Sequence, residues 1–136
     1  MKLRGVLESV LYCDDLERGE RFYLDVLGLE RIVASEGRHV FFRCGDGVVL
    51  LFDPEQVSTV PTEVNGSPIP LHGAKGAGHL AFRATSAEIE AWRDHLVANG
   101  VEIESEVTWP GGGRSVYFRD PAGNSLEIAT PELWEP

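Results

Sequence analysis

Glu8, His79 and Glu127 are the three side chains whose types and positions could bind a divalent metal ion. Each lies in a stretch that alternates polar and apolar residues, as a half-buried β-strand does. The alternation places each of the three on the strand face opposite its apolar neighbours. An ionisable residue on such a face is most often only solvated. A metal site is favoured because the three recur at matching positions of an internal repeat.

One imidazole and two carboxylates make a hard, oxygen-rich site that suits Mn, Ni, Co, Mg or Zn dications. Three protein ligands leave positions open for water or substrate, as a catalytic site requires. A dication there would act as a Lewis acid and stabilise an enolate as it forms. Glu127 or Glu8 could detach and move a proton at the adjacent carbon. The predicted metal ligands are therefore Glu8, His79 and Glu127, and the predicted catalytic residues are Glu127 and Glu8.

The composition limits the possible functions. The chain has 136 residues, 43% of them hydrophobic and 25% charged, which is typical of one globular domain. The net charge of −10 repels phosphate backbones and anionic membranes, so we expect neither nucleic acid nor membrane as a partner. Acidic residues interrupt the N-terminal segment, where a signal peptide would need an apolar run. Cys13 and Cys44 are too few for a disulfide scaffold, which favours a reducing cytoplasm.

The chain contains the same unit twice. Both copies are predicted to hold a strand, a helix that begins at an Asp/Thr-x-x-Glu sequence and ends at a glycine, and three further strands. The helix start Thr85 lies 71 residues after Asp14, just as His79 lies 71 residues after Glu8. In the first copy the predicted strands cover residues 5–13, 29–35, 38–44 and 48–53, and the helix runs from Asp14 to Gly28. In the second they cover 78–83, 101–108, 114–119 and 124–129, and the helix runs from Thr85 to Gly100, with Ile89, Trp92, Leu96 and Val97 as its apolar stripe.

The predicted fold is a single α+β domain of two βαβββ modules, about 1–53 and 78–131. Residues 54–77 are rich in proline and glycine and predict a linker between the modules. Because helices cover one face of each sheet, two copies can form a cupped mixed β-sheet with the helices on the outside. The residues expected on the concave side are Glu8, Val10, Tyr12, Phe41, Arg43, Leu51, His79, Ala81, Arg83, Ser115, Tyr117, Arg119 and Glu127.

Three segments resemble a known family: residues 22–29, residues 78–83 and residues 117–127, the last containing Asp-Pro-x-Gly-Asn-x-x-Glu. Together with the repeat they resemble the vicinal oxygen chelate superfamily. That superfamily includes glyoxalase I, bleomycin-resistance proteins, fosfomycin-modifying thiol transferases, methylmalonyl-CoA epimerases and extradiol dioxygenases.

The resemblance implies a divalent-metal-dependent enzyme of glyoxalase type that acts on a small, oxygen-rich, anionic molecule. The chemistry would be that of an isomerase, epimerase, lyase or thiol transferase. Family ligands lie on the first strand of each module and on the last strand of one or both, positions that match Glu8, His79 and Glu127. The remaining last-strand position falls on Leu51, which cannot bind a metal, whereas glyoxalase I commonly has a ligand there.

Two other functions stay open. Bleomycin-resistance proteins sequester their ligand without metal, and in that case Glu8 and Glu127 would be acidic cup residues beside a stacking surface of Trp109 and Tyr117. An extradiol dioxygenase would use two histidines and one carboxylate, so Glu8 in place of a histidine counts against it.

Three arginines on the predicted cup face of an acidic protein, Arg43, Arg83 and Arg119, favour an anionic substrate. The alternative is that they pair with surface acids. Trp109 begins a glycine-rich loop that could close over the cup. The predicted substrate-binding residues are Arg43, Arg83, Trp109, Ser115, Tyr117 and Arg119. His39, His72 and His95 are predicted not to be ligands. We expect a small-molecule substrate and a homodimer, in which modules pair within one chain or between two chains.

Overall fold

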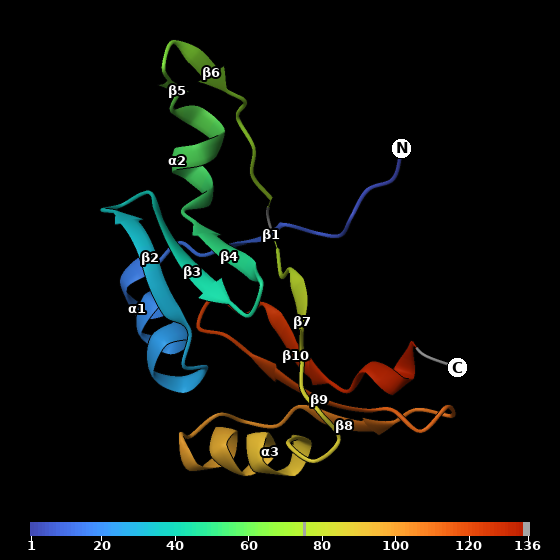
Figure 1. The fold of residues 1–136 in the computed structure, drawn as a ribbon. Helices are drawn as coiled ribbons and strands as arrows, with labels where there is room; N and C mark the ends of the chain where they lie inside the picture. Colours follow the sequence, from blue (N-terminus) through green and yellow to red (C-terminus); the bar gives the residue numbers. More distant parts are fainter. Residues whose placement is uncertain (75, 135–136) are drawn as a thin grey trace. The chain divides into compact units, whose positions relative to one another are not determined.

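The computed structural model describes residues 1–74 and 76–134 and consists of two compact units, Met1–Gly76 and Ala77–Pro136 (Figure 1). Each unit holds a four-stranded sheet, in the order β1-β4-β3-β2 in the first and β7-β10-β9-β8 in the second. In both sheets the first strand pairs parallel with the last strand, and the other neighbours are antiparallel. The predicted α+β class and the two βαβββ modules are confirmed.

The helix of the first unit begins one residue later than predicted. Asp15, not Asp14, is its N-cap, because the Asp15 carboxylate accepts a hydrogen bond from the Arg18 amide at 3.1 Å. The helix ends before Gly28, which has a φ of +68° that glycine adopts without strain. The elements of this unit are β1 (Glu8–Tyr12), α1 (Leu16–Arg21), which continues as a π-helical turn η1 (Phe22–Val26), β2 (Glu30–Ser35), β3 (His39–Cys44) and β4 (Gly47–Phe52).

Leu51 was expected on the open face of the first sheet, and that prediction is wrong. Its side chain is fully buried on the face that α1 covers, where a Cβ added to Gly19 would lie 2.9 Å from Leu51 Cδ2. The reason is register, because Leu51 pairs with buried Leu11 while Glu8 pairs with Val48. Because side chains alternate between the two faces, a one-residue error in the assumed pairing of β4 with β1 places Leu51 on the wrong face.

The connection between the modules is more ordered than the predicted linker. It contains α2 (Pro54–Thr59) and the hairpin of β5 (Thr62–Val64) and β6 (Ser67–Ile69). Asp53 caps α2 by accepting hydrogen bonds from the two amides of Glu55 and Gln56 at 3.0 Å. Val57 of α2 is buried against Leu50 and Phe52, so α2 covers part of the open face of the first sheet.

In the second unit, the predicted first half of one strand is irregular. Residues 101–104 are not in a strand, and β8 begins at Ser105. The helix start is confirmed in part: Glu88 reaches back to the Thr85 amide and hydroxyl, which lowers the pKa of Glu88, but α3 itself begins at Ile89. Val97, placed in the apolar stripe, is 52% exposed. The elements are β7 (His79–Arg83), α3 (Ile89–Ala98), β8 (Ser105–Thr108), β9 (Arg114–Arg119), β10 (Ser125–Ala129) and the 3-10 turn η2 (Pro131–Leu133).

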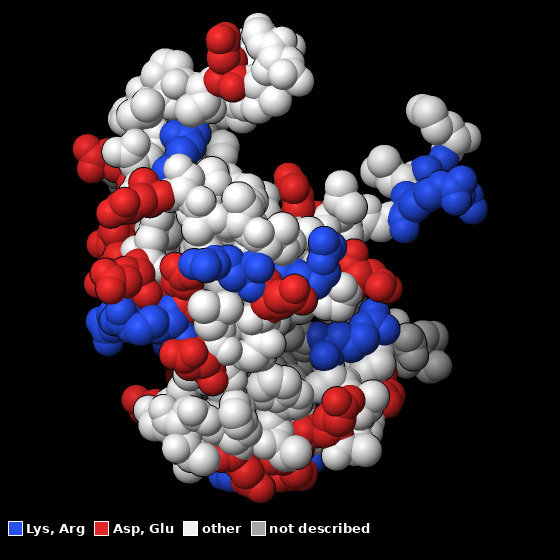
Figure 2. Space-filling model, turned by 60° about the vertical axis from the view of Figure 1, so that its left-hand side comes forward, with Lys and Arg blue, Asp and Glu red and all other residues white. Residues whose placement is uncertain are grey.

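Acidic side chains are spread over the face of the molecule in Figure 2, with basic side chains interspersed among them. None of the described helices is long and apolar enough to cross a membrane.

A close backbone approach fixes the C-terminal turn η2 against the loop before β9. A Cβ added to Gly113 would lie 2.5 Å from the Leu133 amide nitrogen and 2.8 Å from Leu133 Cα. Backbone atoms cannot move aside as a side chain can, so Gly113→Ala should lower the free energy of unfolding by about 1–3 kcal/mol, as overpacking does. Urea unfolding followed by circular dichroism measures this loss.

Gly111→Ala is the matched control for Gly113→Ala. The nearest atom to its added Cβ is the Glu132 carbonyl oxygen at 3.8 Å, which is ordinary contact. Equal stability of the two variants would contradict the close approach.

Candidate metal and catalytic site

His79 and Glu127 lie side by side on one face of the second sheet. β7 and β10 pair in parallel, with His79 opposite Ser125 and Ala81 opposite Glu127, so both side chains project to the same side. His79 Nε2 lies 3.2 Å from Glu127 Oε2. The structure thus brings together two of the three predicted ligands. The Glu127 side chain is 8% exposed and that of His79 is 53% exposed, so the pair lies at the border between core and solvent.

The other nitrogen of His79 has a fixed role. Nδ1 lies 2.9 Å from the Ser125 carbonyl oxygen, and because a carbonyl oxygen only accepts, Nδ1 carries the hydrogen. With its hydrogen on Nδ1, a His79 ring that carries no second hydrogen directs the lone pair of Nε2 towards the carboxylate of Glu127. A carbonyl partner on the second ring nitrogen is what orients a metal-binding histidine.

Two electron-rich atoms that face each other need a cation between them. Two ligands about 2.1 Å from one metal ion are about 3.0 Å apart at the right angle of octahedral coordination and about 3.4 Å apart at the tetrahedral angle. The observed 3.2 Å between His79 Nε2 and Glu127 Oε2 lies between these two distances. The donor set and its geometry therefore suit a divalent cation, with a proton on His79 as the alternative occupant.

Glu127 is held by a chain of hydrogen bonds that starts at Trp109. The indole Nε1–H donates to Ser115 Oγ at 2.8 Å, and the Ser115 hydroxyl donates to Glu127 Oε1 at 2.5 Å. Ser115 is 1% exposed, so water does not compete for this bond. Trp109 and Ser115 were predicted as substrate contacts. The structure shows that they fix one oxygen of Glu127 and leave the other beside His79; their contact with substrate stays a prediction.

Tyr117 stands next to the pair. It is the cross-strand neighbour of Glu127 on β9, and its ring stacks on His79 with centroids 6.3 Å apart. Burial, and then the negative charge of Glu127, raise the pKa of the Tyr117 phenol. The phenol therefore stays protonated at neutral pH and can donate a hydrogen bond.

The Asp-Pro-x-Gly-Asn string positions the start of β7. Asp120 is buried and accepts hydrogen bonds from the Ala122 amide and from the amide and side chain of Asn124. Asn124 Oδ1 in turn accepts from the Gly78 amide at 2.8 Å. Since Gly78 precedes His79, this turn fixes the strand end that carries the histidine.

Glu8 belongs to the first unit, where it is the exposed first residue of β1, as His79 is the first residue of β7. Within the described part of either unit, no three or more His, Cys, Asp and Glu side chains gather as a metal cluster. Glu8 as third ligand stays a prediction.

The first unit offers no carboxylate at the position that corresponds to Glu127. Glu127 pairs with the residue two positions after His79, and Leu50 pairs with the residue two positions after Glu8. The corresponding position is therefore Leu50 and not Leu51. Leu50 is buried and, like Leu51, cannot bind a metal. An aromatic group lies around it: His39 stacks on Phe41, and the His72 ring meets Phe52 edge-on. His39 Nδ1 is buried without a hydrogen-bond partner among the described residues, and burial lowers the His39 pKa.

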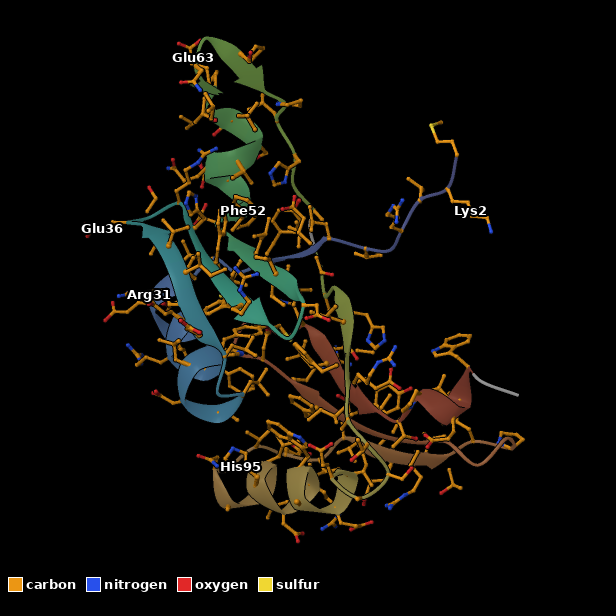
Figure 3. All side chains as sticks on the ribbon, in the orientation of Figure 1. Lys2, Arg31, Glu36, Phe52, Glu63 and His95 are labelled. Atoms are coloured by element: carbon orange, nitrogen blue, oxygen red, sulfur yellow. The ribbon has the colours of Figure 1, made fainter. Side chains whose placement is uncertain are left out.

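His72, which sequence placed in the linker, reaches this open face. Its Nδ1 lies 2.7 Å from Tyr12 Oη, and its backbone amide donates to the Val57 carbonyl oxygen. His95 is exposed on α3, and Phe52 ends β4 (both labelled in Figure 3).

The three predicted substrate arginines differ in their partners. Arg119 forms two hydrogen bonds with Glu104, at 2.7 and 3.0 Å, and a third with the Gly123 carbonyl oxygen. It thus pairs with a surface acid, the alternative raised above. Among the described residues, neither Arg43 nor Arg83 has an ion pair or side-chain hydrogen bond, and both are exposed.

Comparison with known proteins places this geometry in a family. Residues 5–128 match the model of the Glyoxalase/Bleomycin resistance protein/Dioxygenase superfamily. A crystal structure of lactoylglutathione lyase from Agrobacterium tumefaciens shares 43% identity over all of both chains, with a TM-score of 0.93.

Relatives of lower sequence identity include a metallothiol transferase and a virulence protein. Metallothiol transferase FosB of Staphylococcus haemolyticus is 27% identical over 133 residues, which cover 96% of this chain and 86% of the relative. Virulence protein STM3117 of Salmonella typhimurium is 27% identical, over 88% of this chain and 79% of its own length. The chain belongs to the glyoxalase, bleomycin-resistance and dioxygenase superfamily, whose members are also called vicinal oxygen chelate proteins.

Proposed function

We propose that this protein is a divalent-metal-dependent enzyme of glyoxalase type that acts on a small, oxygen-rich, anionic molecule. The observation that carries the proposal is the His79 Nε2 to Glu127 Oε2 distance of 3.2 Å, with the other histidine nitrogen held by a carbonyl oxygen. His79, Glu127 and Glu8 would hold the ion, which would be Mn, Ni, Co, Mg or Zn. A dication there supplies Lewis-acid chemistry towards paired substrate oxygens.

The protein's own groups would then move the proton. Ser115 holds Glu127 Oε1, so Oε2, the oxygen beside His79, would be the one to accept a proton from a substrate carbon and to return it when it is not bound to the ion. The neutral phenol of Tyr117, which interacts with Glu127, would turn its hydrogen to a substrate oxygen beside this carboxylate. If Glu127 proves to be only a ligand, Glu8 is the alternative base.

Lyase or isomerase chemistry is the first candidate, because the lactoylglutathione lyase structure shares 43% identity with the whole chain. Thiol transfer is the second, because metallothiol transferase FosB matches 96% of the chain. Leu50 leaves three protein ligands instead of four, which departs from the ligand set that glyoxalase I commonly has.

We further propose that the chain is one glyoxalase-like domain, with modules of about 1–53 and 78–131 joined by residues 54–77. It would work as a cytoplasmic homodimer on a small-molecule substrate.

Metal analysis tests the proposal directly. Protein purified without chelator or affinity tag should hold about one dication per chain. The same protein should then act in a panel of isomerase, epimerase, lyase and thiol-addition assays, glyoxalase-type hemithioacetals included, run with each of the five dications. A site that stays empty with every one of them would overturn the proposal in favour of metal-free ligand sequestration.

Ser115 is expected to tune metal affinity through Glu127. Ser115→Ala removes the hydrogen bond that orients the carboxylate, and loss of such a partner typically weakens metal binding roughly 10–100-fold. Competition with a fluorescent chelator measures the affinity. Ser105→Ala, an exposed serine on β8, is the control and should bind as the parent does. Unchanged affinity in Ser115→Ala would show that the hydrogen bond does not position the ligand.

A further inference from the structure

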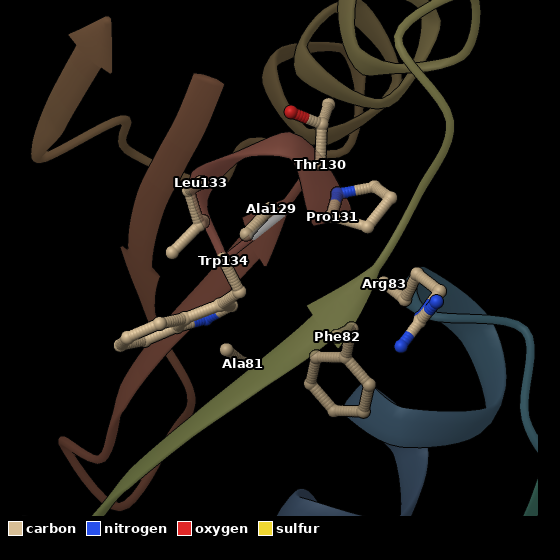
Figure 4. Close-up of a pocket in the computed structure, with 8 residues that line it drawn as sticks. All are labelled: Ala81, Phe82, Arg83, Ala129, Thr130, Pro131, Leu133 and Trp134. Carbon is tan, nitrogen blue, oxygen red and sulfur yellow. The ribbon is translucent and has the colours of Figure 1, made fainter. Parts of the chain in front are cut away.

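A pocket of about 210 Å³ lies in the second unit, beyond the His79–Glu127 pair (Figure 4). Ala81 and Arg83 of β7 form one wall and Ala129 of β10 adjoins them, while Leu133 and Trp134 of the C-terminal turn form the other.

Three of the lining residues, Ala81, Arg83 and Ala129, lie on the same sheet face as the candidate metal ligands, while Phe82 lies on the other face of β7. Along β7 that face carries His79, then Ala81, then Arg83, and along β10 it carries Glu127 and then Ala129. With a rise of about 3.3 Å per residue, the Cα atoms of His79 and Arg83 are roughly 13 Å apart along the strand. The two alanines between them leave the strand surface free of long side chains, so an elongated molecule can lie along it.

Arg83 is the charged group of this pocket. The second unit has four arginines, and three of them pair with glutamates: Arg93 with Glu106, Arg114 with Glu90 and Arg119 with Glu104. Among the described residues, Arg83 has no such partner, although the chain carries 22 acidic residues. An unpaired guanidinium in a pocket is suited to an oxyanion, which it binds through two parallel N–H groups.

Trp134 supplies the apolar side of the pocket. Its side chain is 85% exposed, and in Figure 4 its indole stands at the rim above Ala81. Covering exposed aromatic surface beside a pocket removes it from water, which favours ligand binding. An apolar segment lying on Ala81 and Ala129 would contact Leu133 and Trp134.

We propose that this pocket anchors the non-reacting end of the substrate. Arg83 binds a terminal carboxylate, and Trp134 with Leu133 covers a short apolar chain that runs along β7 towards His79. The substrate class is thus an elongated monocarboxylate whose opposite end reacts. The reaction at the opposite end rests on the proposed function, whereas the binding of the carboxylate by Arg83 is independent of it.

The test is binding of hexanoate to the full chain, followed by NMR on the indole N–H signal of Trp134. Hexanoate should shift that signal, and Arg83→Gln should weaken binding at least tenfold, because the variant loses a charge-assisted pair of hydrogen bonds. Hexanol has the same chain without the charge and should bind at least tenfold more weakly than hexanoate. Arg21→Gln, on the surface of α1, should bind hexanoate as the parent does.

Further ligands and outcomes separate the possibilities. Butyl phosphate binding more tightly than hexanoate through Arg83 would overturn the carboxylate in favour of a phosphate. Equal hexanoate affinity in the parent and Arg83→Gln would overturn the anchoring site. The metal content of Arg83→Gln should match that of the parent. A chain that binds hexanoate through Arg83 but never binds metal would retain the anchoring site and refute the proposed function. A chain that binds metal but not hexanoate would refute the anchoring site and retain the proposed function.

Discussion

Replacing Glu127 with glutamine should lower turnover by roughly two to four orders of magnitude, the usual contribution of a positioned general base. The amide keeps the size of the side chain and one oxygen donor but cannot accept a proton from carbon. The amide oxygen should take the Oε2 position beside His79, so much of the metal should stay bound, while the amide NH2 faces Ser115 Oγ in place of Oε1. The measurement is kcat on the best substrate of the assay panel, together with metal content.

Glu102→Gln controls for the loss of one negative charge. Glu102 is exposed in the irregular segment before β8 and should leave both kcat and metal content unchanged. Parental turnover in metal-loaded Glu127→Gln would show that Glu127 is at most a ligand, and Glu8→Gln would then be the variant to test for loss of the base.

The faces of the candidate ligands were predictable because strand alternation is local. His79 and Glu127 each lie between apolar residues, so their common orientation follows from a two-residue period. The same reasoning failed for Leu51. Its face depends on where β4 begins relative to β1, and register is set by pairing with another strand and not by the segment itself.

The sequence of residues 54–77 contains the signals for its short helix and hairpin. Asp53-Pro54 is a typical helix start, and Asn65-Gly66 is a typical two-residue hairpin turn, here with φ of +50° and +81°. High proline and glycine content predicts a linker, but here these residues mark the ends of short elements.

The partners of the site residues could not be predicted from sequence. Trp109 and Ser115 stay predicted substrate contacts, but the sequence did not indicate that their hydrogen bonds lead to Glu127. Nor did it indicate that Glu104, in a segment predicted as strand, is the partner of Arg119. Such pairings depend on side-chain geometry across strands, which spacing along the chain does not encode.

Removal of His79 is expected to abolish most metal binding and to leave the fold intact. His79→Ala deletes one of three proposed ligands, so its effect should exceed the roughly 10–100-fold loss that removal of a hydrogen-bond partner such as Ser115 causes.

The fold should survive this substitution because the His79 ring is 53% exposed and contributes little to the core. Metal should therefore raise the melting temperature of the parent, since a ligand that binds only the folded state stabilises it, but should not raise that of the variant. His95→Ala, a histidine on the exposed side of α3, should respond to metal as the parent does. Full metal occupancy in His79→Ala would mean that the 3.2 Å pair holds a proton between His79 and Glu127, and that any metal lies elsewhere.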